Sequence, residues 1–264
     1  MFPIQWRHQW KFVRPGPNHT LYYSMGAPCN SCEPENEKED APRPPVSKFG
    51  QASIHRLDPN DPEHTDVVIA QGVRNSIGFD IRPGTQDELW FTENGRDELG
   101  DDIPNDELNK VSHIGEHFGW PYCMTNGDKV VEDPKLKSKE AGFCETTTKA
   151  MVPLDPHSAA LGMRFYRGHK FPKQFRGGIF LAEHGSWNRK RLSGYQVVTV
   201  NPKTLKAEPF ITGWLNKDMN FSWGRPSDIE QMADGSLLIS DDGVPGTNLE
   251  GAIYRVEYTG KAQQ

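Results

Sequence analysis

Long apolar runs and sustained helical periodicity are both missing from this sequence of 264 residues. The apolar runs that do occur are short, rich in β-branched or aromatic residues, and bounded by Gly, Pro, Asp and Asn. None approaches the roughly 20 apolar residues that a membrane-spanning helix needs. Together with 25 Gly and 21 Pro, the pattern predicts many short strands joined by turns, and no membrane span.

Clustered basic charge is also lacking. The formal net charge is −6, and the 30 Lys and Arg residues are scattered along the chain. Binding to a phosphate backbone needs clustered Lys and Arg, so we expect no nucleic-acid partner. The first 15 residues lack the apolar core of a signal peptide.

Cysteine is scarce, with four residues in the chain: Cys29, Cys32, Cys123 and Cys144. The C-x-x-C pair could be half of a zinc site, a redox pair or a small disulfide loop. No second C-x-x-C supplies the spacing of a zinc finger, and Pro-rich flanks disfavour the helix that a redox motif opens. We expect the disulfides Cys29–Cys32 and Cys123–Cys144, with the other two interpretations as alternatives.

A repeat of strand, turn, strand, polar loop and strand occurs four times. The central strands are expected at 21–26, 89–95, 179–185 and 237–243. The strands before them are expected at 8–13, 74–81, 157–163 and 225–229, and those after them at 53–57, 107–111, 195–200 and 252–256. A repeated antiparallel unit of this size predicts an all-β propeller of four-stranded blades around a channel, with a large β-sandwich as the alternative.

Each first strand of the repeat is expected to begin with polar residues: His8, Arg74 with Asn75, His157 and Arg225. In a propeller these starts converge on one end of the channel. Arginine forks suit carboxylates and quinone oxygens, and a histidine can accept a proton near neutral pH. Each residue alone would more often make a structural hydrogen bond, but their equivalence across the repeats favours a site for an anionic, planar ligand.

Two further segments are candidates for binding. The loop 93–109 is rich in carboxylates, which suit a hard cation such as calcium, although a solvated acidic loop is the alternative. The basic segment 189–191 follows His184 at the end of a central strand, where a simple surface turn is the alternative.

Several segments resemble the soluble glucose and L-sorbosone dehydrogenases that depend on pyrroloquinoline quinone (PQQ), including the aldose sugar dehydrogenases and fungal pyranose dehydrogenases. These segments are 26–30, 72–80, 88–97, 100–109, 118–123, 157–163 and 183–188. The resemblance implies a six-bladed propeller with PQQ and calcium. It also implies oxidation of an aldose, sorbosone or related pyranose, with electrons passed to an external acceptor such as a cytochrome, a quinone or a dye.

The resemblance also implies roles for individual residues. His8 resembles the general base beside the oxidised carbon, and Arg74 resembles the arginine that polarises the quinone. The backbone carbonyls of Gly95 and Arg96 resemble calcium ligands. The expected PQQ contacts are Asn75, Asn94, His157, His184, Arg189, Arg191 and Arg225, with Lys190 as an alternative to its arginine neighbours in pairing with a PQQ carboxylate.

The family has six blades and this chain shows about four, so we expect residues 1–264 to form a propeller dehydrogenase domain that lacks N-terminal blades. Family members are commonly exported, which agrees with the expected disulfides and predicts a secreted or periplasmic protein. The alternative functions are a non-catalytic propeller that binds calcium or a sugar, and a calcium-dependent hydrolase of the lactonase type.

Overall fold

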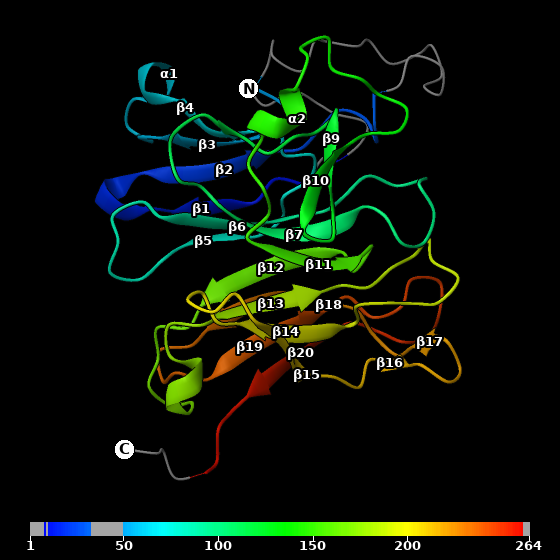
Figure 1. Cartoon of the computed structure of the whole chain (residues 1–264). Helices are drawn as coiled ribbons and strands as arrows, with labels where there is room; N and C mark the ends of the chain where they lie inside the picture. Colours follow the sequence, from blue (N-terminus) through cyan, green and yellow to red (C-terminus); the bar gives the residue numbers. More distant parts are fainter. Residues whose placement is uncertain (1–7, 9, 33–49, 261–264) are drawn as a thin grey trace.

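The computed structural model describes residue 8 and residues 10–32 and 50–260. Within these ranges the strands form four larger sheets and two short hairpins (Figure 1). Helical segments are short: α1 (Pro62–Thr65), α2 (Phe143–Thr146) and the 3-10 turns Pro17–His19 and Lys173–Phe175. The prediction of a nearly all-β, antiparallel protein is confirmed.

The strand order of the four larger sheets follows the chain. The first sheet contains β1 (Val13–Pro15), β2 (Leu21–Met25), β3 (Ser53–Leu57), β4 (Val67–Gln71) and β8 (Glu116–His117). The second contains β5 (Phe79–Ile81), β6 (Leu89–Glu93), β7 (Asn105–Lys110) and β11 (Val152–Pro156). The third contains β12 (Ala160–Phe165), β13 (Ile179–Glu183), β14 (Gln196–Val200) and β15 (Ala207–Ile211). The fourth contains β18 (Pro226–Gln231), β19 (Leu237–Asp241) and β20 (Ala252–Val256).

The predicted repeat is visible in these sheets. The central strands β2, β6, β13 and β19 and the strands that follow them, β3, β7, β14 and β20, lie where the sequence places them. The first strands of the repeat, β1, β5, β12 and β18, begin later than predicted. Within the described residues the fourth sheet has three strands instead of the expected four. We call β1, β5, β12 and β18 the inner strands.

Alternating side chains of the central strands explain why the sheets stack. Successive residues of a strand point to opposite faces, and in β6 Leu89 and Phe91 pack toward the first sheet while Trp90 packs toward the third. In β13, Ile179 and Leu181 join the cluster shared with the second sheet, and Phe180 joins the cluster shared with the fourth. Both faces of these two strands are therefore apolar, and the second and third sheets each pack against a neighbour on both sides.

Two glycines let the inner strands approach closely. A Cβ added to Gly78 would lie 2.9 Å from the Gly162 Cα, and one added to Gly162 would lie 2.6 Å from the Asp228 Cα. These contacts join β5 to β12 and β12 to β18 at the backbone, where no side chain fits.

Ion pairs tie the inner strands together further along. Arg14 Nε of β1 lies 3.0 Å from Asp80 Oδ1 of β5, and Arg167 Nη1, just after β12, lies 2.7 Å from the other oxygen of Asp80. Arg164 Nε of β12 lies 2.8 Å from Glu230 Oε2 of β18. Asp80 is buried, so its two arginine partners compensate a charge that would otherwise be costly.

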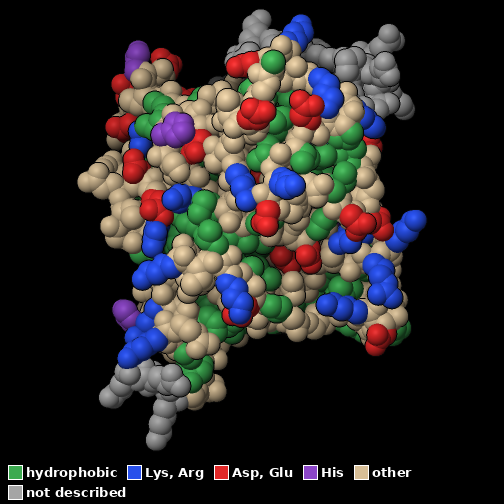
Figure 2. Space-filling view, in the orientation of Figure 1, with side chains coloured by type: hydrophobic (Ala, Val, Ile, Leu, Met, Phe, Trp, Pro, Cys, Tyr) green, Lys and Arg blue, Asp and Glu red, His purple; other side chains and the backbone are tan. Residues whose placement is uncertain are grey.

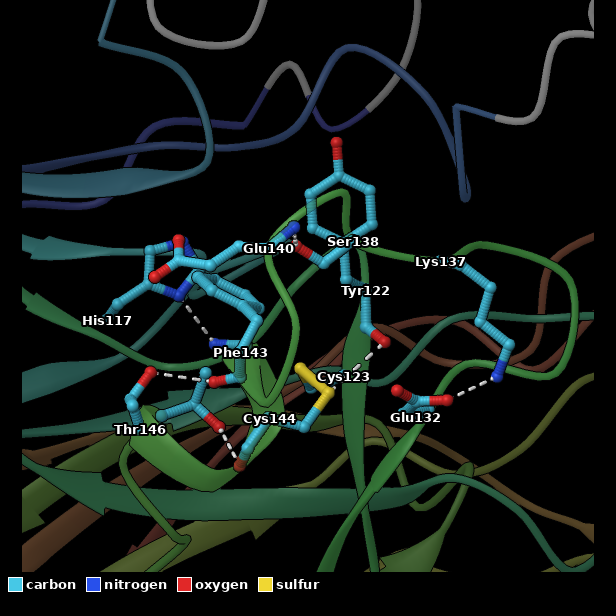
Figure 3. The surroundings of a disulfide bond; sticks show 12 residues. His117, Tyr122, Cys123, Glu132, Lys137, Ser138, Glu140, Phe143, Cys144 and Thr146 are labelled. Atoms are coloured by element: carbon cyan, nitrogen blue, oxygen red, sulfur yellow. Dashed lines mark hydrogen bonds and ion pairs between the residues drawn. A yellow bond between two sulfur atoms is a disulfide. The ribbon is translucent and has the colours of Figure 1, made fainter.

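Two short hairpins and two disulfides complete the described structure. The hairpins are β9 (Cys123–Asn126) with β10 (Lys129–Glu132), and β16 (Leu215–Asn216) with β17 (Phe221–Ser222). The Cys123–Cys144 disulfide joins β9 to α2, where the Phe143 ring lies edge-on to Tyr122 (Figure 3). The Cys29–Cys32 disulfide closes a loop after β2. Both predicted disulfides are therefore confirmed.

The surface carries mixed charge. On the face drawn in Figure 2, Lys and Arg side chains lie beside Asp and Glu side chains over most of the area. No helix in the described ranges is long and apolar enough to cross a membrane.

Replacing Gly162 by alanine tests the close approach of the inner strands. We expect Gly162→Ala to lower the free energy of unfolding by about 2–3 kcal/mol, because the new methyl group overlaps the backbone at Asp228. The control is Gly84→Ala, whose Cβ meets nothing within 4 Å and whose positive φ of 82° costs only about 1 kcal/mol. Urea denaturation measures the free energy of unfolding of both variants. Equal decreases in the two would contradict the packing argument.

Candidate functional site

The predicted site residues lie in the loops that lead into the inner strands. His8 precedes β1, Arg74 and Asn75 precede β5, His157 precedes β12, and Arg225 precedes β18. The prediction that the strands begin at these residues is wrong. His8 and His157 have positive φ angles of 48° and 59°, which are not strand conformations.

Hydrogen bonds join these loops from sheet to sheet. Three of them connect the sheets in order: Ala27 N to Arg74 O (2.7 Å), Asn94 Nδ2 to Ala160 O (3.1 Å) and Arg225 Nε to His184 O (3.2 Å). The loops of all four sheets thus form one continuous arc at the same end of the inner strands. The structure therefore brings the predicted residues of different repeats into one region.

Arg74 is the most completely bonded residue of this region. It is 4% exposed, and each of its five N–H donors reaches a protein acceptor. Nε and one Nη2 proton go to the two oxygens of Asn30 (2.9 and 2.8 Å), and the other Nη2 proton goes to Asp97 Oδ2 (3.1 Å). Nη1 donates to the carbonyls of Asn94 (3.2 Å) and Gly95 (2.9 Å). Burial lowers the pKa of Arg74, and the carboxylate of Asp97 opposes this effect.

Three other residues predicted to hold a cofactor or metal, Asn75, Asn94 and Gly95, lie next to Arg74. Asn94 donates its backbone and side-chain N–H groups to Asn75 O (3.1 and 3.0 Å). Gly95 N donates to Asp106 Oδ1 (2.8 Å). Asn75 Oδ1 is buried and has no hydrogen-bond partner among the residues that the structure describes. This oxygen could therefore accept a hydrogen bond from a ligand or contact a cation.

Arg96 directs its side chain into the protein. Its guanidinium forms a buried ion pair with Asp133 (Nη1 to Oδ2, 2.8 Å), and both side chains are 2% exposed. The prediction for Arg96 concerns its backbone carbonyl, whereas this ion pair involves only its side chain. Breaking such a buried pair from one partner is costly, so the ion pair fixes the backbone around residues 95–96.

The acidic loop makes contacts with the basic segment. Asp97 Oδ1 accepts from Asn188 Nδ2 (2.8 Å), Asp101 Oδ2 accepts from Lys190 N (3.2 Å), and Asp102 Oδ1 accepts from Arg189 Nη2 (3.4 Å). Among the described residues, no group of three or more His, Cys, Asp and Glu side chains is placed to hold a metal ion. Asp97, Asp101 and Asp102 thus connect this loop to residues 188–190.

The three predicted histidines differ in their partners. His8 Nδ1 lies 2.8 Å from Ala27 O, so Nδ1 carries the proton and Nε2 the lone pair of the neutral ring. His157 Nε2 lies 2.8 Å from Gly100 O. His184 Nε2 lies 3.0 Å from Asp242 Oδ2, but burial and the nearby Arg225 lower its pKa to about 4.

The predicted basic residues are bound to different degrees. Arg225 donates to the carbonyls of His184 and Gly185, and its guanidinium lies 5.4 Å from the centre of the Tyr195 ring. Arg189 Nη1 donates to Pro156 O (3.3 Å), whereas Arg189 Nε is buried and finds no acceptor within the described part of the chain. Arg191 is exposed.

Buried acids are a part of the site that the sequence interpretation missed. Glu93 and Asp241 end central strands, and each accepts a backbone N–H from the loop that leads into the inner strand of the same sheet: Arg74 N (2.6 Å) and Arg225 N (2.6 Å). Glu93 lies opposite Glu107 in the β6–β7 pairing, and burial followed by this like charge raises the pKa of Glu93 well above its usual range. Burial also raises the pKa of Glu183 to about 7. The sequence signal for these acids is a carboxylate at the end of an apolar strand, as at Glu93, Glu183 and Asp241.

The fold is shared with known carbohydrate-active and sugar-oxidising enzymes. It matches the calcium structure of the Trichoderma reesei carbohydrate-active enzyme family AA12 with a TM-score of 0.75 and 16% identity, covering 97% of this chain and 70% of the other. It matches the holo form of the PQQ domain of pyranose dehydrogenase from Coprinopsis cinerea with a TM-score of 0.70 and 18% identity, covering 97% and 71%.

Sequence comparison places the chain in a family. Residues 12–220 match the TrAA12-like family model, and the chain belongs to this family. It is 40% identical over 198 residues to an uncharacterized protein of Borreliella burgdorferi (73% of this chain, 49% of that protein). It is 27% identical over 161 residues to the PQQ-dependent pyranose dehydrogenase of Coprinopsis cinerea (50% and 21%). The chain thus spans half or less of the length of these two relatives.

The raised pKa of Glu183 predicts a pH-dependent stability. Between its usual pKa near 4.5 and about 7, the folded protein holds a proton that the unfolded chain has lost, so the free energy of unfolding falls as pH rises through this window. We expect Glu183→Gln, which keeps an acceptor for Gln196, to raise the free energy of unfolding at pH 8 by about 2–3 kcal/mol and to change it little at pH 4.

Urea denaturation at pH 4, 6 and 8 checks this expectation. The control is Glu63→Gln on the exposed side of α1. If Glu183→Gln raised the free energy of unfolding equally at all three pH values, titration of the Glu183 carboxylate would not be the cause of the pH dependence.

Proposed function

We propose that this chain carries the PQQ- and calcium-dependent site of a sugar dehydrogenase. The substrate is an aldose, sorbosone or related pyranose, and the electrons pass to an external acceptor. Family membership supports the reaction class. The observation that carries the proposal is the arc of inner-strand loops, which gathers a buried arginine, amide groups and a histidine with a defined tautomer in one region.

The residues present fit the proposed ligands. PQQ is a planar quinone with three carboxylates, which need N–H donors. The buried Nε of Arg189, which has no acceptor in the described ranges, is such a donor, and Arg225 supplies a second guanidinium in the arc. Calcium takes oxygen ligands, which the backbone carbonyls of Gly95 and Arg96 would supply. The buried Oδ1 of Asn75, which has no partner among the described residues, would accept a hydrogen bond from the cofactor.

The roles of the protein groups follow from these contacts. When bound, PQQ would take up the two electrons of the oxidation, and calcium would act as a Lewis acid on it. His8 would accept the hydroxyl proton of the sugar at Nε2, because its Nδ1–H is held by Ala27 O. Arg74 would stabilise developing negative charge by its buried positive charge, and a direct contact would require it to exchange one protein acceptor.

The remaining predicted residues take supporting roles in this proposal. Asn94 and Asn75 would hold the cofactor, with the carbonyls of Gly95 and Arg96 on calcium. His157, His184 and Arg191 complete the set proposed to surround PQQ. Burial and Arg225 keep His184 neutral at pH 7, so it would act as a hydrogen-bonding group instead of a cation.

The architecture is proposed in the same terms. The four sheets would be blades of a propeller, with the inner strands facing the channel. The chain covers 70% and 71% of the two AA12 and pyranose dehydrogenase structures described above, so the complete activity is proposed for the whole protein. The two disulfides support a secreted or periplasmic location.

Titration with PQQ tests the proposed function. We expect the purified, calcium-loaded protein to bind PQQ, to lose this binding when a chelator removes calcium, and to bleach a redox dye when aldoses are added. A folded protein that binds calcium and sugars but not PQQ would instead favour the non-catalytic propeller. Hydrolysis of lactones without PQQ would favour the lactonase alternative.

Replacing His8 tests the proposed base. We expect His8→Ala to reduce the rate of sugar oxidation by at least about 100-fold, with the dissociation constant of PQQ changed less than about threefold, because His8 acts on the sugar. The control is His64→Ala, which removes an exposed histidine of α1 paired with Asp61. Turnover that survives the His8 change would reject this assignment.

A further inference from the structure

The small loop closed by Cys29–Cys32 lies against the most buried arginine of the site. Cys29 is 3% exposed and packs with Ala27, Ala52 and Trp120 in a small apolar cluster. The loop between the cysteines holds Asn30, which is 6% exposed. A short loop with its ends linked covalently and one end packed in this cluster has little freedom to move.

Asn30 accepts four hydrogen bonds. Its backbone oxygen accepts from Arg74 Nε (2.9 Å) and from the indole N–H of Trp120 (3.2 Å). Its side-chain Oδ1 accepts from Arg74 Nη2 (2.8 Å) and from Asp97 N (2.9 Å). Both oxygens therefore have two donors each, which is the full capacity of a carbonyl oxygen.

The two bonds to Arg74 hold one edge of the guanidinium. Nε and Nη2 lie on the same edge of the planar group, and they meet two oxygens of a single residue, which fixes both position and tilt. The carbonyls of Asn94 and Gly95 hold the remaining nitrogen. Removing the Asn30 side chain would free one Nη2 proton of Arg74 together with the N–H and the carbonyl of Asp97. The backbone oxygen of Asn30 would still accept from Arg74 Nε and from Trp120.

We propose that Asn30 is a positioning residue for Arg74, and that the Cys29–Cys32 disulfide holds Asn30 in place. The disulfide loop thus sets the orientation of the arginine without contacting the substrate. The catalytic consequence rests on the proposed function of Arg74, whereas the restraint on Arg74 does not depend on it.

Chemical modification of arginine tests the restraint directly. Phenylglyoxal labelling followed by peptide mass spectrometry reports the reactivity of each arginine in the folded protein. We expect Asn30→Ala to raise the labelling rate of Arg74 at least about tenfold, and Asn30→Asp, which keeps the acceptor oxygen, to stay within about twofold of the unmodified protein.

Internal references separate this effect from unfolding. Exposed Arg191 should label in every variant, and Arg96, buried in its ion pair with Asp133, should stay protected in every variant. Asn201→Ala is the matched control, because Asn201 Oδ1 also accepts two N–H groups (2.9 and 3.2 Å) but lies in an exposed turn far along the chain. Protection of Arg74 in Asn30→Ala would overturn the proposal.

The two disulfides provide a second comparison. We expect the double variant Cys29→Ser with Cys32→Ser to expose Arg74 to labelling, and Cys123→Ser with Cys144→Ser to leave it protected. Equal protection of Arg74 in both double variants would reject the role of the Cys29–Cys32 loop.

Turnover separates the positioning role from general stability. With PQQ and sugar, we expect kcat of Asn30→Ala to fall about 10- to 100-fold while KM changes less than about threefold, and Asn30→Asp to restore kcat, because a small misplacement of a catalytic group mainly slows the chemical step. If Arg74 becomes reactive in Asn30→Ala but no form of the protein oxidises sugar, the restraint stands and the proposed function fails. An unchanged kcat in an active Asn30→Ala would reject the positioning role.

Discussion

A buried guanidinium must have an acceptor for every N–H group, and this requirement organises the region around Arg74. Transferring an unpaired charge out of water costs many kcal/mol, so the burial of Arg74 is possible only with its complete set of acceptors. These acceptors come from two loops that are far apart in sequence, residues 29–32 and 94–97. The hydrogen bonds of this one side chain thereby join the first two sheets at the site.

The stacking of the sheets provides the platform for this arrangement. Apolar residues on both faces of the central strands require neighbours on both sides, and Gly78 and Gly162 allow the inner strands to meet at the backbone. Since the inner strands are fixed by these contacts and by the ion pairs of Asp80, the loops that lead into them start from fixed positions. Polar groups can then be placed in the loops without loss of the apolar core.

Much of this fold could be predicted from the sequence, because short apolar runs bounded by turn residues mark the central strands directly. The starts of the inner strands could not, because His8 and His157 adopt backbone angles that their residue types do not indicate. The repeat also pointed to Arg74 and Asn75, and the family resemblance added Asn94. Segment 26–30 also resembles the family, but the sequence indicated no role for Asn30, which lies 44 residues from Arg74 and meets it only through tertiary structure.

The carboxylates of Glu93 and Asp241 hold the loops by their backbone and not by their side chains. Each accepts the main-chain N–H of the residue that opens its loop, at position 74 or 225, and that interaction is the same for any residue type except proline. The attachment of the loop therefore places no demand on the side chain that the loop presents. A scaffold of this kind keeps the loop attached while side chains further along the loop change, which is one physical route by which related proteins come to bind different molecules.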